Sequence, residues 1–257
     1  MYRQDSWSIA GKRFNSRLLH CFGNATDKID LKTAVGFINR TETDFLTVYT
    51  QGSLDDFKDA EELPMGYSGI SYGDIKHWLK RKYTILVNTN HALSVEEAVK
   101  RGELGSRLLK SRWIKLEVLN KKLTRPMNKK TARAAKILLK KGYLVMPLMT
   151  ANLKDALRFE KIGCSVVRVL LSDIGSEQGM KDEKLFRKIC ERVTIPVIAE
   201  GGIGGSEDAY KAMAVGASAV LVNKSLFSYQ DPFLFVEALK SSIKGGRLTY
   251  LCNQQKY

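Results

Sequence analysis

The sequence predicts a single-domain α/β protein, a (β/α)8 barrel (TIM barrel) that spans residues 1–257. Three observations support this fold class. Eight short apolar or β-branched runs recur along the chain, segments with helical periodicity separate them, and 257 residues suffice for one such barrel. An open doubly wound sheet is the alternative, but the turn after the first run, "HCFGNA", lacks the GxGxxG pattern expected there.

The expected strands are apolar runs that alternate with helices, so neighbouring strands should run parallel. The eight runs cover residues 16–23, 44–50, 83–88, 113–119, 143–149, 164–171, 194–200 and 218–223.

Helix ends are marked by capping residues between these runs. Ser94 with Glu97 three residues later forms a capping box that starts a helix, and Gly163 ends another helix that starts near residue 152. Further helices are expected at residues 182–193 and 206–215, and after Pro232.

The formal net charge of +15 is the most unusual property of the composition. A basic surface attracts nucleic acid, anionic membranes or phosphorylated ligands. The densest basic run, Lys121 to Lys141, also has an amphipathic helical pattern, which favours a solvated helix face over a polyanion site. The expected apolar stripe consists of Ala132, Ala135, Ile137 and Leu138. Nucleic acid binding is not expected, because no zinc finger, RNP motif or basic zipper is present.

Several other classes of protein are also disfavoured. No apolar run approaches the roughly 18 residues that a membrane-spanning helix requires, and the first residues lack a secretory apolar core. We therefore expect a cytoplasmic protein, or one of the plastid stroma. The four cysteines and three histidines are scattered, so neither a disulfide framework nor a metal site is expected.

A lysine in the run "WIKLEV" stands out as a candidate functional residue. Side chains alternate along a strand, so Trp113, Lys115 and Glu117 share one face, and the apolar residues between them face the helices. Lys115 and Glu117 should then face the barrel interior. Such a lysine either pairs with a carboxylate or is desolvated so that its pKa falls and the neutral amine attacks a carbonyl. The pattern leaves both possibilities open.

A glycine-rich turn follows the seventh expected strand, and "GASAVLVNKSLF" repeats the strand-turn arrangement one unit later. Barrels commonly bind phosphate at these last two turns, where backbone N–H groups approach the ligand closely. We expect Gly201, Gly202 and Gly204 to contribute to a phosphate site, with Glu200 beside it at the strand end. The alternative is that these glycines only permit tight turns.

Several motifs together resemble a known family. They are "IAGKRFNSRLL", "VNTNHALSVEEAV", "WIKLEV", "SDIGSEQG", "PVIAEGGIGGSEDA", "GASAVLVNKSLF" and "GGRLTY". Their order and content are similar to those of bacterial and plastid thiazole synthases, which build the thiazole phosphate of thiamine. The similarity extends over nearly the whole chain.

The resemblance implies roles for individual residues. Lys115 would form an imine with the ketone of 1-deoxy-D-xylulose 5-phosphate, Glu117 would be an acid/base, and Glu200 replaces the family's aspartate by a longer carboxylate. The implied phosphate ligands are Gly175, Gly201, Gly202, Asn223 and Lys224. No metal and no tightly bound cofactor are implied.

The resemblance also implies partners. Sulfur would arrive as a thiocarboxylate at the C-terminus of a small ubiquitin-like carrier protein, and dehydroglycine would supply the remaining carbon and nitrogen. A homo-oligomer is expected, since the family is usually oligomeric.

Two other functions remain open. The loop "MTAN" at residues 149–152 and Lys224 depart from the family pattern and favour related sulfur insertion into another sugar phosphate, as in 2-thiosugar synthases. The net charge of +15 favours a non-catalytic basic barrel that binds a polyanion.

Overall fold

The computed structural model describes residues 5–23, 30–50, 57–66 and 69–255. Eight parallel strands form a barrel in the order β3-β10-β9-β8-β7-β6-β5-β4, and the edge strands β3 and β4 contact each other. The strands are β3 (Leu18–His20), β4 (Phe45–Tyr49), β5 (Thr84–Asn88), β6 (Trp113–Leu116), β7 (Leu144–Thr150), β8 (Val167–Leu170), β9 (Val197–Glu200) and β10 (Ala219–Val222). All eight fall within or close to the predicted runs, so the (β/α)8 barrel is confirmed.

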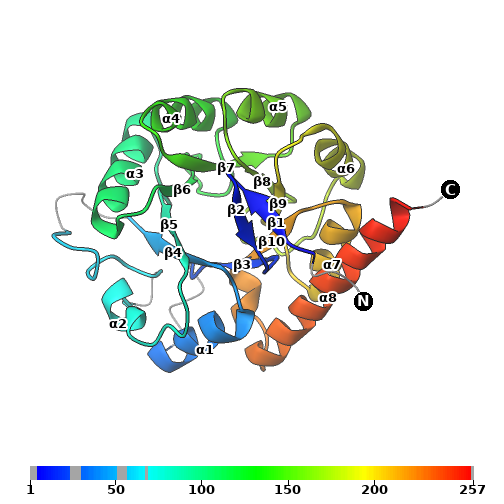
Figure 1. The fold of residues 1–257 in the computed structure, drawn as a ribbon, viewed down its shortest axis with the longest axis horizontal. Coiled ribbons are helices and arrows are strands. Elements are labelled where there is room, and N and C mark those ends of the chain that lie inside the picture. Colours follow the sequence, from blue (N-terminus) through cyan, green and yellow to red (C-terminus); the bar gives the residue numbers. More distant parts are fainter. Residues whose placement is uncertain (1–4, 24–29, 51–56, 67–68, 256–257) are drawn as a thin grey trace.

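The helices surround the strands as an outer ring (Figure 1). They are α1 (Leu31–Thr41), α2 (Tyr72–Lys76), α3 (Val95–Leu109), α4 (Asn128–Lys140), α5 (Leu153–Lys161), α6 (Glu183–Arg192), α7 (Ser206–Val215) and α8 (Pro232–Asn253). The Ser94 cap is confirmed, because its side chain accepts a hydrogen bond from the Glu97 N–H at 3.0 Å, but the predicted capping box is incomplete: the Glu97 side chain accepts from the Leu93 N–H at 2.8 Å instead of the Ser94 N–H. Gly163 lies just past α5 with a φ of 98°, as predicted.

The apolar stripe of α4 differs in two positions from the prediction, because Ala132 is only partly buried and Ile137 is exposed. Ala135 and Leu138 are buried, but Ile137 is 40% exposed. Thr131 and Ala134 are buried instead, because residues 131, 134, 135 and 138 have the i, i+3, i+4, i+7 spacing of one helix face. In the described ranges, no helix is both long and apolar enough to cross a membrane.

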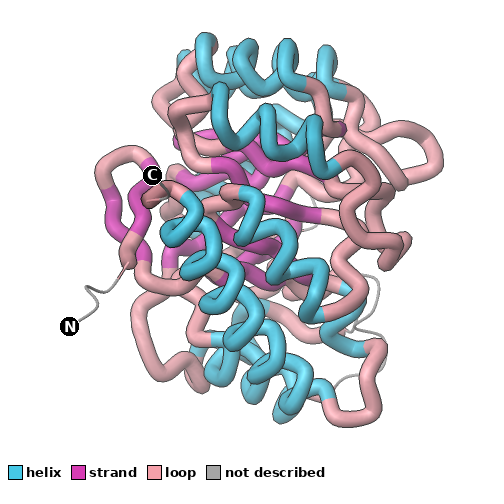
Figure 2. Tube along the Cα trace, turned by 90° about the vertical axis from the view of Figure 1, so that its right-hand side faces the viewer, coloured by secondary structure: helices cyan, strands magenta, loops and turns pink. Residues whose placement is uncertain are grey.

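An antiparallel hairpin that the sequence did not predict closes one end of the barrel. Its strands, β1 (Trp7–Ile9) and β2 (Lys12–Phe14), have three residues each, too few for a recognisable alternation. The hairpin lies at the left end of the barrel in Figure 2. Phe14 stacks on Phe45 at 4.4 Å between ring centroids and meets Trp113 edge-on at 5.8 Å. In the part of the chain that the structure describes, this aromatic layer fills the N-terminal end of the barrel interior, so the interior is closed at this end.

Candidate active site

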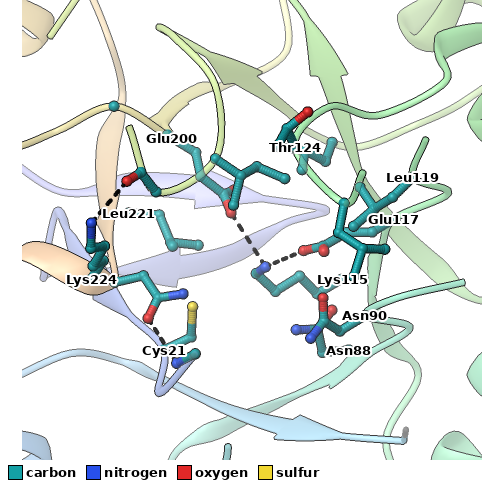
Figure 3. Close-up of a pocket in the computed structure, with 18 of the residues that line it drawn as sticks. Cys21, Asn88, Asn90, Lys115, Glu117, Leu119, Thr124, Glu200, Leu221 and Lys224 are labelled. Carbon is teal, nitrogen blue, oxygen red and sulfur yellow. Dashed lines mark hydrogen bonds and ion pairs between the residues drawn. The ribbon is translucent and has the colours of Figure 1, made fainter. Parts of the chain in front are cut away.

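A cavity of about 470 Å³ lies at the C-terminal ends of the barrel strands (Figure 3). Among the residues that line it, Glu200 ends β9 and Asn88 ends β5. Ligand sites of barrels form at this end, where the βα loops begin. Lys115, Glu117 and the glycine turn after β9 all contribute to the wall.

Lys115 on β6 faces the barrel interior, as the alternation predicted, and its side chain is 2% exposed. Its Nζ donates to Glu117 Oε1 and, at 3.3 Å, to Glu200 Oε1 (Figure 3). Burial and the charge of Arg168 act to lower the pKa of Lys115, but the charges of Glu117 and Glu200 outweigh them, so its pKa lies above the usual value. The amine is therefore paired and charged at rest, and the possibility that its pKa falls is wrong.

Glu117 follows β6 directly and is fixed through its backbone. Its N–H donates to Thr89 Oγ1 at 2.9 Å, and Thr89 Oγ1 donates back to the Glu117 carbonyl at 3.0 Å. Burial acts to raise the pKa of the Glu117 carboxyl, but the nearby charges of Lys115 and Arg168 hold it below its usual range. Glu117 is thus a buried carboxylate in direct contact with the lysine nitrogen.

Arg168 on β8 completes the charge cluster, and the sequence analysis missed it. Its side chain is 0% exposed, and Nη1 donates to Glu200 Oε2 at 2.6 Å and to Glu117 Oε1 at 3.3 Å. The alternation that identified Lys115 also assigns Arg168 to the interior face of the run 164–171, so the signal was present in the sequence. Two cations and two carboxylates therefore form one buried cluster: Lys115, Arg168, Glu117 and Glu200.

Two uncharged polar groups line the cavity beside this cluster. Asn88 is the register partner of Lys115 on the neighbouring strand, and its buried Oδ1 has no hydrogen-bond partner among the described residues. A buried unpaired oxygen is costly unless a ligand supplies a donor. Burial raises the pKa of the Cys21 thiol to about 11, so this thiol is protonated at neutral pH.

The glycine turn after β9 lines the cavity with its backbone. Gly201 and Gly202 have φ values of 72° and 73°, and a Cβ at either position would collide with neighbouring atoms, those of Leu170 and Ser172 respectively. Only glycine fits at both positions. Gly175 lies near this turn, and the Lys224 Nζ donates to its carbonyl at 3.2 Å.

The loop after β10 completes this part of the wall. The Asn223 side chain accepts a hydrogen bond from the Gly23 N–H at 2.7 Å and so joins the loops after β10 and β3. Lys224 starts a short 3-10 helix (Lys224–Phe227), and its side chain is 55% exposed. The structure therefore brings Gly175, Gly201, Gly202, Asn223 and Lys224 to one cavity.

Gly204 does not line this cavity. Its N–H donates to Asp208 Oδ2 at 3.0 Å, and the same carboxylate oxygen accepts from the Gly205 N–H at 3.2 Å. Asp208 thereby satisfies the backbone donors that precede α7, which leaves the Gly204 N–H committed within the protein.

The chain matches the family model described as thiazole biosynthesis protein ThiG over residues 8–257. It is 34% identical to a thiazole synthase of Prochlorococcus marinus (strain MIT 9301) over 263 residues, covering 100% of this chain and 94% of that protein. It is also 34% identical over 251 residues to a thiazole synthase of Magnetococcus marinus, covering 97% of this chain and 73% of that protein.

A similar solved structure is the Amycolatopsis orientalis BexX/CysO complex. The TM-score is 0.83 with 26% identity, and the match covers 97% of each chain.

Proposed function

Because the chain belongs to the thiazole synthase family, the enzymes of thiazole biosynthesis, we propose that it uses Lys115 to bind a keto-sugar phosphate covalently during sulfur transfer. The substrates would be 1-deoxy-D-xylulose 5-phosphate, dehydroglycine, which supplies the ring nitrogen and one carbon, and a carrier-protein thiocarboxylate, which supplies the sulfur. The product would be a thiazole phosphate. The observation that carries the proposal is the Lys115 amine, which lines a cavity between two carboxylates and shares that cavity with the glycine turns.

Imine formation begins with a proton transfer, because the resting amine is charged. Glu117 accepts the proton of Lys115, and the neutral amine then adds to the substrate ketone to give a carbinolamine. Glu117 returns the proton to the departing hydroxyl, which leaves as water. The resulting protonated imine carries one positive charge at the position of the original ammonium, so the cluster keeps its charge balance.

Glu200 is the candidate base for the next step. Its Oε1 lies 3.3 Å from the lysine nitrogen, so it can reach a carbon next to the imine carbon. The protonated imine accepts the electron pair that this carbon keeps when it loses its proton. An enamine forms, and reprotonation at a different atom moves the carbonyl along the sugar.

The phosphate of the substrate would bind at the turns after β8, β9 and β10. Lys224 supplies a positive charge there, and the backbone at Gly201 and Gly202 approaches the cavity without side chains. We assign Gly175, Gly201, Gly202, Asn223 and Lys224 to this site. We exclude Gly204 from the phosphate site, because its N–H already donates a hydrogen bond to Asp208.

A sulfur-carrier protein would dock at the barrel mouth, and the sulfur of its C-terminal thiocarboxylate would bond to the imine-bearing sugar. Water would then cleave the bond between the acyl carbon and sulfur, so that the sulfur stays on the sugar and the carrier leaves as a carboxylate. Leu93 and Met127, each 42% exposed, follow β5 and β6 and so lie at the mouth end. Residues 118–154 contain no aspartate or glutamate, and Lys122 lines the cavity. A basic rim with exposed apolar side chains suits an acidic protein partner. The relative with a TM-score of 0.83 was solved in a two-protein complex.

A second candidate is sulfur insertion into a different keto-sugar phosphate. Lys224 favours it, because this side chain lines the cavity and adds charge beside the phosphate turns. The lysine imine chemistry would be the same, and only the sugar would differ.

Borohydride reduction tests the proposal and separates the two candidates. The protein is incubated with 1-deoxy-D-xylulose 5-phosphate or with a six-carbon 2-keto sugar phosphate, reduced, digested and analysed by mass spectrometry. The proposal expects an adduct on Lys115 with the mass of the reduced five-carbon sugar, and none on Lys224. An adduct only with the six-carbon sugar would favour the second candidate, and no adduct with either would refute both.

A further inference from the structure

We propose that Arg168 is a positioning residue that makes the two carboxylates of the cluster unequal. It ties Glu200 through Oε2 and leaves Oε1 facing the lysine nitrogen, so that Glu117 alone exchanges a proton with Lys115. This inference rests on the proposed imine chemistry of Lys115.

The guanidinium of Arg168 is fixed by backbone carbonyls of β7, which pairs with β8, and of β6, the next strand along the sheet. Nη2 donates to the Leu116 carbonyl of β6 at 3.0 Å, and Nε donates to the Met146 carbonyl of β7 at 3.0 Å. A guanidinium is planar and rigid, so these two bonds fix the direction of the remaining N–H groups. Nη1 is thereby directed at the carboxylates.

Each cation of the cluster has one nearer and one more distant carboxylate. Nη1 of Arg168 lies 2.6 Å from Glu200 Oε2 and 3.3 Å from Glu117 Oε1. Lys115 contacts Glu117 most closely and lies 3.3 Å from Glu200 Oε1. Glu117 is therefore the nearest acceptor for the lysine proton, and Arg168 holds the Glu200 carboxyl group in place beside the lysine nitrogen.

The charge of Arg168 also helps the lysine to lose its proton. Arg168 acts to lower the pKa of both Lys115 and Glu117, so its removal would leave Lys115 alone with two carboxylates. The other titratable groups at the cluster are Cys21 directly after β3 and Tyr49 on β4, with His91 in the loop after β5. None of these is a cation that could replace the guanidinium at neutral pH.

The test compares Arg168→Met, Arg168→Lys and a matched control, Arg17→Met. Arg17 is also a buried arginine, paired with Asp5 at 2.8 Å, but it directly precedes β3 at the other end of the barrel and does not line the cavity. Two rates are measured with 1-deoxy-D-xylulose 5-phosphate. The first is the rate of borohydride-trapped adduct at Lys115 across about pH 6.5 to 10, and the second is deuterium exchange at the carbon next to the imine, followed by NMR. Circular dichroism verifies folding.

Arg168→Met should slow adduct formation about tenfold near pH 8 and displace its pH profile upward by about one unit, because a neighbouring charge shifts a pKa by that much or more. Arg168→Lys keeps the positive charge but loses the planar, rigid set of guanidinium N–H groups that positions Glu200. Adduct formation should therefore stay within about threefold of wild type, whereas deuterium exchange should fall about tenfold. Arg17→Met should leave both rates and the pH profile unchanged.

Two results would overturn the inference. The first is a pH profile of adduct formation in Arg168→Met that coincides with that of wild type. The second is an equal loss of adduct formation and deuterium exchange in Arg168→Lys, which is the result expected if Arg168 has only a general structural role. If Arg168→Met does not fold, the ratio of deuterium exchange to adduct formation in Arg168→Lys tests the inference: a lower ratio than in wild type supports it, and an unchanged ratio refutes it. Failure of wild type to form an adduct would instead refute the proposed function itself, which separates the two cases.

Discussion

Replacement of Lys115 by methionine should abolish the adduct and leave a folded protein whose stability loss depends on pH. Methionine nearly matches the volume of the lysine stem, so the cavity contribution is small. The change leaves Glu117 and Glu200 with Arg168 as the one remaining cation of the cluster. Breaking a buried ion pair costs about 3–5 kcal/mol, whereas a domain is stable by about 5–15 kcal/mol. The variant should therefore fold at neutral pH.

The sign of the pH effect follows from the two pKa shifts in the wild type. The lowered pKa of Glu117 contributes stability above its unfolded value that is lost as the pH falls through the folded value. The raised pKa of Lys115 contributes stability below its unfolded value that is lost as the pH rises through the folded value. Without the Lys115 ammonium, the Glu117 carboxyl takes up a proton more readily. The loss of unfolding free energy relative to wild type is therefore smaller at acidic pH than at neutral pH.

Guanidinium chloride unfolding near pH 7.5 and near pH 5 measures this effect. The difference in unfolding free energy from wild type should be about 3–5 kcal/mol at the higher pH and smaller at the lower. Lys136→Met on the exposed face of α4 is the control and should change stability by less than about 0.5 kcal/mol. A borohydride adduct in Lys115→Met, or an equal stability loss at both pH values, would refute the reasoning.

Three further predictions concern other residues of the barrel. Glu200→Gln should still form the adduct but should slow deuterium exchange by about 10²- to 10⁴-fold, and NMR would reveal exchange at the wild-type rate if Glu200 were only structural. Lys224→Met should raise the apparent dissociation constant of the sugar phosphate about tenfold with an unchanged maximal trapping rate; unchanged affinity would remove Lys224 from the phosphate site. Burial lowers the pKa of His20 from 6.5 to about 4, so the folded state resists protonation and wild type should lose about 3 kcal/mol of stability as the pH falls through that range. His20→Asn should remove this loss while the exposed-site control His77→Asn keeps it, and parallel unfolding curves for all three proteins would contradict the assignment.

The sequence predicted the barrel because the expected strands were short apolar runs and segments with helical periodicity separated them. The same alternation placed Lys115 and Glu117 in the interior, and applied to residues 164–171 it would have placed Arg168 there too. The hairpin of β1 and β2 escaped prediction because three residues do not establish a period. Its role in closing the barrel depends on contacts with Phe45 and Trp113, which are distant in the chain.

The pairing of the charges was beyond prediction from the sequence. Lys115 and Glu200 are 85 residues apart, and Arg168 is 51 residues from Glu117, so only the closed barrel brings the four groups together. The sequence also could not predict which backbone N–H groups of the glycine-rich turn form hydrogen bonds within the protein. Gly201 and Gly204 belong to one glycine-rich turn, but Asp208 accepts the hydrogen bond of the second and not of the first.

The buried cluster explains how a charged lysine can still act as a nucleophile. A lone lysine in this cavity would become neutral through desolvation, but it would then leave no group to accept and return protons during imine formation. With Glu117 in contact, the proton moves over a single hydrogen bond, and the cluster stays electrically balanced before and after the transfer. Arg168 balances the charge of Glu200 throughout, so the same buried ion pairs that make the cluster costly to break also keep a base in place for the following step.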